Sequence, residues 1–142
     1  GNIQSHLSFV TSQSFVVNML PNFHLTTNDT LFIKLGGFLG HCQGDLLPHL
    51  SFDPSVFNLS SAVCNTSDSS VTLSLQVESD VPKGTSMSVT VSKSAGIELP
   101  AGGLTTSADF DRVTIRAEAK GALVLETPFL WTGGSIQRVG TL

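Results

Sequence analysis

The feature that most constrains this chain is the strict alternation of apolar and polar residues over 71–78. Successive side chains of a β-strand point to opposite faces of the sheet, so this alternation gives one apolar and one polar face. A second alternating run covers residues 87–92, and the segment between the two contains Pro82 and Gly84, which favour a turn. The pattern predicts two half-buried strands joined as a hairpin.

Shorter alternating segments recur along the chain, separated by clusters of Gly, Pro, Asn, Asp and Ser. They cover residues 7–11, 15–17, 31–35, 112–118, 123–125 and 136–139. A helix over 109–125 is disfavoured because β-branched residues occupy 113–115 and Gly121 interrupts it. The sequence therefore predicts an all-β fold, a single antiparallel β-sandwich of about seven to nine strands with at most one short helical turn.

The chain is expected to form one domain over residues 1–142. Its 142 residues are 40% hydrophobic, which suffices for one core, and no repeat or linker divides it. Residues 1–17 alternate, are rich in Ser and contain few charges that would block pairing at a sheet edge. They are a candidate strand segment for donation to, or pairing with, another copy of the chain.

Low charge excludes some partners. Charged residues make up 13% of the chain and the net charge is −4, whereas 19 Ser and 14 Thr form nearly a quarter of it. A protein that follows a phosphate backbone needs a basic surface, so nucleic-acid binding is not expected. Polar residues interrupt every apolar run within a few positions, so the sequence predicts no membrane-spanning segment.

Cys42 and Cys64 are the two cysteines of the chain. An even pair in a Ser/Thr-rich sequence indicates a disulfide, and closing a loop of about twenty residues would stabilise the fold by roughly 3 kcal/mol. Two buried, reduced thiols in a cytosolic protein are the alternative.

Three Asn-x-Ser/Thr acceptor sequences, here called sequons, begin at Asn28, Asn58 and Asn65. Asn28 lies in a polar turn and Asn65 begins a polar run, and such places tolerate a bulky glycan. Together with the cysteine pair, the sequons predict N-glycosylation at two or more of the three candidate positions and an extracellular location, either secreted or at the cell surface. The N-terminus does not read as a signal peptide, so the first residue is interpreted as a mature or excised start.

Possible metal ligands do not form a recognised pattern. The densest group consists of His41, Cys42, Asp45 and His49. The two histidines are eight residues apart, with Gly and Pro between them, so they do not share a helical face as zinc ligands often do. Asp109 and Asp111 lack the rest of a twelve-residue calcium loop. No metal site is predicted.

Catalytic motifs are also missing from the sequence. It contains no Gly-x-Ser-x-Gly element, and the glycine-rich residues 36–40 lack the lysine of a phosphate-binding loop, so they are interpreted as a tight turn. We expect neither an enzyme nor a cofactor.

Three stretches, residues 25–38, 81–85 and 96–104, resemble recurrent elements of secreted algal and protist surface glycoproteins. Each element is a turn followed by a strand, and together they cover roughly residues 5–130. The usual turn of those repeats is replaced here by Leu35-Gly36-Gly37-Phe38. The resemblance implies an immunoglobulin-like β-sandwich repeat domain, similar to the protomers of glycosylated extracellular helical filaments.

The leading functional hypothesis is a structural protomer of an extracellular glycosylated filament or coat. It would assemble with copies of itself through β-strand edges, and N-linked glycans would cover its exposed faces. The alternative is a carbohydrate-binding or adhesive module of a larger surface protein, using Trp131 and the loops over residues 41–52.

Overall fold

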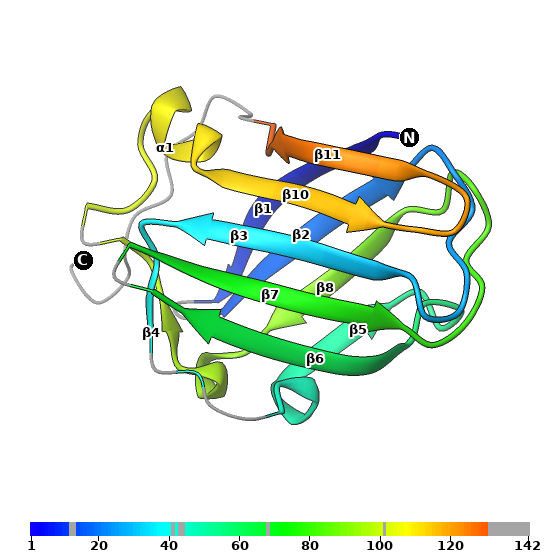
Figure 1. Cartoon of the computed structure of the whole chain (residues 1–142). Helices are drawn as coiled ribbons and strands as arrows, with labels where there is room; N and C mark the ends of the chain where they lie inside the picture. The colour runs from blue at the N-terminus through cyan, green and yellow to red at the C-terminus, as the bar shows by residue number, and fades with distance from the viewer. Residues whose placement is uncertain (12–13, 41, 43–44, 68, 101, 131–142) are drawn as a thin grey trace.

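The computed structural model describes residues 1–11, 14–40, 42, 45–67, 69–100 and 102–130. Two antiparallel sheets pack face to face as a sandwich (Figure 1). The nine strands of these sheets are β1 (Ile3–Thr11), β2 (Ser14–Pro21), β3 (Thr30–Gly36), β5 (Leu50–Asp53), β6 (Leu59–Thr66), β7 (Ser70–Val77), β8 (Met87–Val91), β10 (Val113–Glu118) and β11 (Leu123–Pro128). Their order is β1-β2-β8-β5 in one sheet and β11-β10-β3-β7-β6 in the other.

Short elements complete the fold. Two-residue strands β4 (Leu39–Gly40) and β9 (Ile97–Glu98) pair with each other, and two 3₁₀ turns, η1 (Leu47–His49) and η2 (Lys93–Ala95), lie near them in sequence. The helix α1 spans Ser107–Asp111. The prediction of an all-β sandwich with at most a short helical turn is therefore confirmed.

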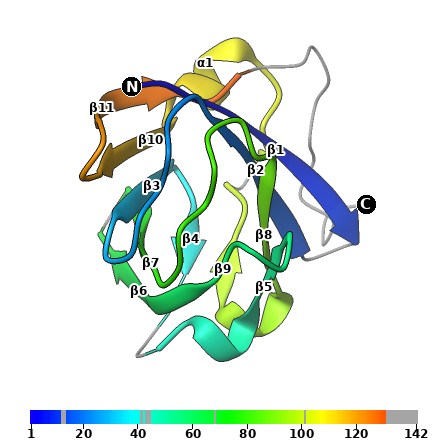
Figure 2. The ribbon, with the colours of Figure 1, turned by 90° about the vertical axis from the view of Figure 1, so that its right-hand side faces the viewer.

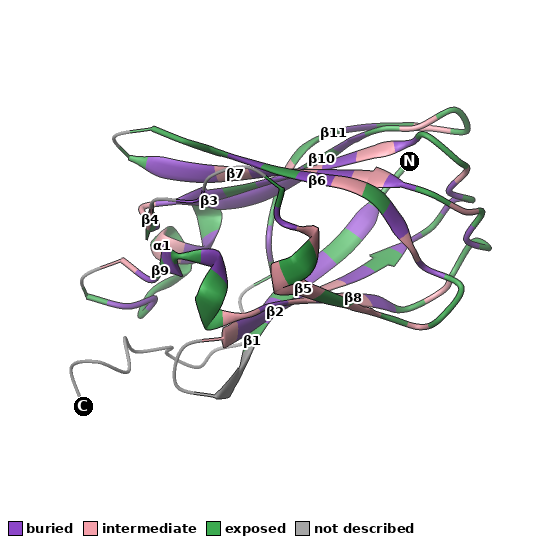
Figure 3. Cartoon of the chain, turned by 90° about the horizontal axis from the view of Figure 1, so that it is seen from below, coloured by how far each residue is buried: buried purple, intermediate pink, exposed green. Residues whose placement is uncertain are grey.

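The core fills the space between the two sheets, where the buried residues of both layers face each other (Figure 3). In the centre of the five-stranded sheet, Leu73 of β7 pairs with Ile33 of β3, and both are fully buried. Burying a side chain of this size stabilises a fold by about 2 kcal/mol. The apolar face predicted for residues 71–78 is thus the inner face of β7, as its alternating burial shows.

The predicted turn after the strand at residues 31–35 is confirmed. β3 ends at Gly36, and Gly37 has a φ of +82°, which a residue with a Cβ rarely adopts. A Cβ at Gly37 would also lie 3.1 Å from the Arg112 guanidinium.

The predicted hairpin is wrong, because β7 and β8 belong to different sheets. β7 pairs with β3 and β6, whereas β8 pairs with β2 and β5. The connection between them crosses the sandwich and is held midway by Val81 and Leu25, which exchange backbone hydrogen bonds of 2.9 and 3.0 Å. Alternation reports which face of a strand is buried but does not identify its neighbour, and this connection is long for a hairpin.

Strand β6 was not predicted, because a bulge between Leu59 and Ser61 breaks its alternation. Beyond the bulge, Ala62 and Cys64 point into the core while Val63 is exposed. The strand expected over residues 136–139 lies outside the described residues.

Candidate functional site

Four strands form the borders of the two sheets, and they meet in pairs at the two sides of the sandwich. β1 and β11 share one side, because Leu130, just after β11, donates its backbone N–H to the Ser5 carbonyl of β1 at 2.8 Å. β5 and β6 share the other, because Leu46, just before η1 and β5, donates to the Ala62 carbonyl of β6 at 3.0 Å. Figure 2 shows the two pairs at opposite ends of the view. These borders are where another chain could add to the fold.

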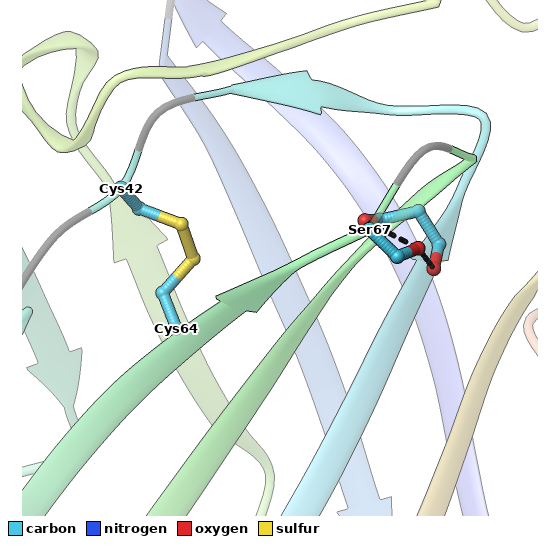
Figure 4. The surroundings of a disulfide bond; sticks show 4 residues. Cys42, Cys64 and Ser67 are labelled. Atoms are coloured by element: carbon cyan, nitrogen blue, oxygen red, sulfur yellow. Dashed lines mark hydrogen bonds between the residues drawn. A yellow bond between two sulfur atoms is a disulfide. The ribbon is translucent and has the colours of Figure 1, made fainter.

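The β5–β6 side is closed by a covalent bond. Cys42 and Cys64 form the predicted disulfide, with their Cα atoms 6.0 Å apart (Figure 4). The bond ties the segment that precedes β5 to β6, and Asp45 forms an isolated antiparallel bridge with Val63 next to it. The border of β6 is therefore partly occupied by its own chain.

Two of the three sequons flank β6. Asn58 immediately precedes the strand, and its half-buried side chain donates from Nδ2 to the Ser55 carbonyl at 3.1 Å. Asn65 lies near the end of the strand and is exposed. The hydroxyl of its sequon residue Ser67 lies 3.0 Å from the Ser70 hydroxyl (Figure 4). A glycan at either position would stand beside the β6 border.

The third sequon begins at Asn28, which is exposed in a tight turn before β3 with a φ of +74°. The backbone N–H of Asn28 donates to the Val77 carbonyl at 2.8 Å. Glu78, which follows Val77, donates its backbone N–H to the Asn58 carbonyl at 2.9 Å. Asn28 and Asn58 therefore lie at the same end of the sandwich, close to the end of β7.

A buried carboxylate builds the Asn28 turn. Asp29 accepts from the backbone N–H of Thr26 at 2.7 Å through Oδ2 and from that of Lys120 at 2.9 Å through Oδ1. It thereby joins the turn before β3 to the turn between β10 and β11. Asp29 was not predicted as a structural residue, although an Asn-Asp pair in a polar turn is the local signal for such a contact.

The border of β1 presents backbone groups on the side away from β2. Paired residues of an antiparallel ladder alternate between bonding the neighbour and pointing away from it. Asn22 donates to Asn2, and Ser5 accepts from Leu130 on the opposite side. The same alternation directs the N–H and C=O groups of Ile3 and Leu7 to the side where Leu130 lies.

The side chains of β1 leave that border uncharged. Ile3 and Leu7 are buried in the core, and His6 is exposed on the outer face. The strand contains no Lys, Arg, Asp, Glu or Pro, the residues that most often prevent edge pairing. Ser5 is only 2% exposed, and among the described residues its hydroxyl has no hydrogen-bond partner.

The border of β11 is protected by contrast. A bulge interrupts its ladder with β10 between Ile115 and Ala117, as a register shift also does in the ladder of β1 between Phe9 and Thr11, so the difference between the two borders lies in the residues that follow. Pro128 has no N–H to offer, and the Thr127 hydroxyl donates to the Leu125 carbonyl at 2.8 Å. These are devices that prevent strand addition. The fourth border strand, β5, is only four residues long.

The described members of the group His41, Cys42, Asp45 and His49, for which no metal site was predicted, have other contacts. Cys42 is in the disulfide, Asp45 accepts from the Leu47 N–H at 3.0 Å, and His49 Nδ1 lies 2.8 Å from the Ser94 hydroxyl. His41 lies outside the described residues, as does Trp131. Over the described part of the chain, no three His, Cys, Asp or Glu side chains gather as a metal site would require.

Asp109 has a structural role as a helix cap. It accepts from the backbone N–H groups of Thr105 at 2.8 Å and Thr106 at 3.1 Å, and Thr106 caps α1 in return. The backbone N–H groups of these two residues hold the pKa of Asp109 below its ordinary value.

None of the helices in the described residues is long and apolar enough to cross a membrane. No family model matches the chain, and neither a curated protein nor a solved structure matches it.

Proposed function

We propose that this chain is an extracellular, N-glycosylated structural domain that associates with copies of itself through the border of β1. The observation that carries the proposal is the difference between the four borders. β6 is bridged and flanked by sequons, β11 is protected, and β5 is short. β1 is nine residues long and uncharged apart from His6, and the contact described on its border is one hydrogen bond from the Leu130 N–H to the Ser5 carbonyl.

The extracellular location rests on the disulfide and the sequons. A disulfide persists in oxidising compartments and is rare in the cytosol. Asn28 and Asn65 are exposed, so a glycan at either would extend into solvent without displacing the core. Asn58 is half-buried and donates to Ser55, so a glycan there has less room.

Self-association through β1 needs no cofactor. Two copies related by a two-fold axis would bring their β1 strands together antiparallel and join two four-stranded sheets into one of eight. The main-chain groups of Ile3 and Leu7 would supply the ladder, and the copy would replace the bond from the Leu130 N–H to the Ser5 carbonyl between them. The resemblance to immunoglobulin-like repeat domains of filament-forming surface glycoproteins favours an extended assembly.

The proposal is tested by expressing the chain through a eukaryotic secretory pathway and measuring sedimentation over a range of concentrations, with electron microscopy of the concentrated sample. We expect association that grows with concentration and a loss of mass when N-glycans are removed enzymatically. A molecule that stays monomeric, carries no sugar and binds a carbohydrate would contradict the proposal and support the alternative of a carbohydrate-binding module.

Paired variants locate the contact. His6→Lys with Ser8→Lys places two charges on the exposed face of β1, and Ser51→Lys places one on β5, the other border of the same sheet. Edge lysines oppose strand pairing, so the β1 variant should lose association while the β5 variant keeps it. Equal behaviour of the two variants would exclude the β1 border.

A further inference from the structure

The most exposed apolar side chains of the described residues lie in or just after β11. Leu125 is 74% exposed, Leu123 65% and Leu130 53%. Leu123 and Leu125 alternate with the buried Val124, so their side chains lie on the outer face of the five-stranded sheet. Neighbouring exposed leucines on one face of a sheet are typical of an interaction surface.

Charged and aromatic side chains adjoin the two leucines. Glu118 of β10 lies directly opposite Leu123 in the ladder. Arg116, two residues earlier on the same face, places its guanidinium 3.3 Å from the Glu118 carboxylate. The central carbon (Cζ) of the Arg116 guanidinium is 3.8 Å from the ring centroid of Phe32 on β3. We call Leu123, Leu125, Arg116, Glu118 and Phe32 the leucine face.

We infer that the leucine face is a second contact between copies of this chain, distinct from the β1 border. In a two-fold arrangement the leucines of one copy pack on those of the other, and Arg116 of each copy approaches Glu118 of its partner. The inference rests on the proposed function, since it assumes that the chain self-associates.

Charge balance favours a second copy as the occupant. The leucine face carries one cation and one anion, and the shallow pocket near it is lined by two cations, Lys34 and Arg112, and two anions, Asp111 and Glu126. A surface with equal numbers of cations and anions can be complementary to itself, because in a two-fold dimer each cation can lie opposite an anion of the other copy. A nucleic acid or an anionic membrane would require an excess of positive charge.

The mode of contact follows from the protected border. Since the bulge, Pro128 and the Thr127 hydroxyl oppose strand addition at β11, a copy would contact this region through side chains. No sequon lies in β10 or β11. Asn65 is exposed on β6 at the opposite border of the same sheet, so its glycan would restrict the contact to the β10–β11 half.

Two different contacts explain how a chain of copies could grow. A two-fold contact uses the same surface on both partners, so one such contact alone closes a dimer. The β1 border points along the plane of its sheet, whereas the leucine face points outward from the other sheet, so a copy can occupy each. A small patch of this kind makes a weak contact, and its effect grows when the β1 contact holds neighbours close.

The test compares the wild-type chain with Leu123→Lys plus Leu125→Lys by sedimentation velocity and electron microscopy. Val63→Lys is the matched control, since Val63 is 44% exposed on β6. We expect the leucine variant to stop at dimers held by β1, with growth beyond the dimer at least about tenfold weaker. The Val63 variant should assemble like the wild type. Because all three residues are exposed, the variants should keep the wild-type melting temperature.

A charge exchange gives a second readout. Arg116→Glu alone should weaken growth beyond the dimer, and Arg116→Glu with Glu118→Arg should restore it, since the exchanged pair is again complementary between copies. Growth of the leucine variant equal to that of the wild type, or an equal loss in the Val63 variant, would overturn this inference and leave the β1 contact standing. A wild-type chain that is monomeric at every concentration would instead overturn the proposed function itself.

Discussion

The two sides of this sandwich are closed by different chemistry. On the β5–β6 side, the Cys42–Cys64 disulfide ties the chain to β6, and two sequons flank that strand. On the β1–β11 side, the described closure is the hydrogen bond from the Leu130 N–H to the Ser5 carbonyl. Neither β1 nor β11 carries a sequon. Under the proposed function, the β5–β6 side stays closed and carries glycans, and the β1–β11 side contacts a neighbouring copy.

The largest expected effect comes from opening the covalent side. Cys42→Ala with Cys64→Ala removes a bond that spans 22 residues, and we expect the free energy of unfolding to fall by about 3 kcal/mol. Urea unfolding measures it. The variant should be insensitive to reductant, whereas the wild type should lose a similar amount of stability when reduced. Equal urea midpoints for variant and wild type would show that the disulfide does not secure this side.

The next effect concerns two turns at one end of the sandwich, which hydrogen bonds to Asp29 hold together. Asp29→Ala leaves the N–H groups of Thr26 and Lys120 without their acceptor, which should cost about 2 kcal/mol. Asp80→Ala is the control, because Asp80 is exposed and accepts a weaker bond of 3.3 Å from Thr27, so its loss should cost less than about 0.5 kcal/mol. Similar losses in the two variants would mean that Asp29 does not hold the two turns together.

A smaller effect of opposite sign is expected within β1. Ser5→Ala removes a buried hydroxyl that has no partner among the described residues, so the free energy of unfolding should rise by about 1 kcal/mol. The backbone is unchanged, so self-association should persist. Ser8→Ala is the control: its exposed hydroxyl accepts from Asn18 at 3.0 Å, and its loss should bring no gain. A destabilised Ser5 variant would reveal a partner for the Ser5 hydroxyl.

The smallest effect is a pH dependence near α1. The pKa of Asp109 is lower in the folded chain than in the unfolded one, so its contribution to stability is present above about pH 4 and is lost as the pH falls through the folded value. Asp109→Asn should lower the melting temperature slightly at pH 7 and reduce its decline in acid. Asp111→Asn, at an exposed position of the same helix, is the matched control variant. If the melting temperatures of the Asp109 variant and the wild type changed with pH in parallel, Asp109 would not stabilise the fold through its lowered pKa.

Local patterns predicted much of the fold. Alternation identified the inner faces of β7 and β8, and the glycines at 36–37 identified a turn. It did not identify the partner of β7, because strand order depends on packing between distant segments. The bulge concealed β6, since one extra residue shifts the period of two.

In the candidate site the disulfide was predicted, but the contacts between distant segments were not, because local patterns do not report them. With only two cysteines, one pairing was available, and the Cys42–Cys64 bond is the predicted one. The contact of Asp29 with Lys120 joins residues 91 positions apart, which no local pattern reports. The protection of β11 depends on which carbonyl the Thr127 hydroxyl reaches, and that is a property of the folded chain.

Hydrogen exchange of the amide groups, compared between the dilute and the concentrated chain, tests the central claim most directly. If β1 recruits a second copy, the peptide covering Ile3 to Leu7 should exchange more slowly in the concentrated sample, while the peptide covering β6 should not change. Slower exchange confined to β6, or exchange at β1 that does not depend on concentration, would contradict it.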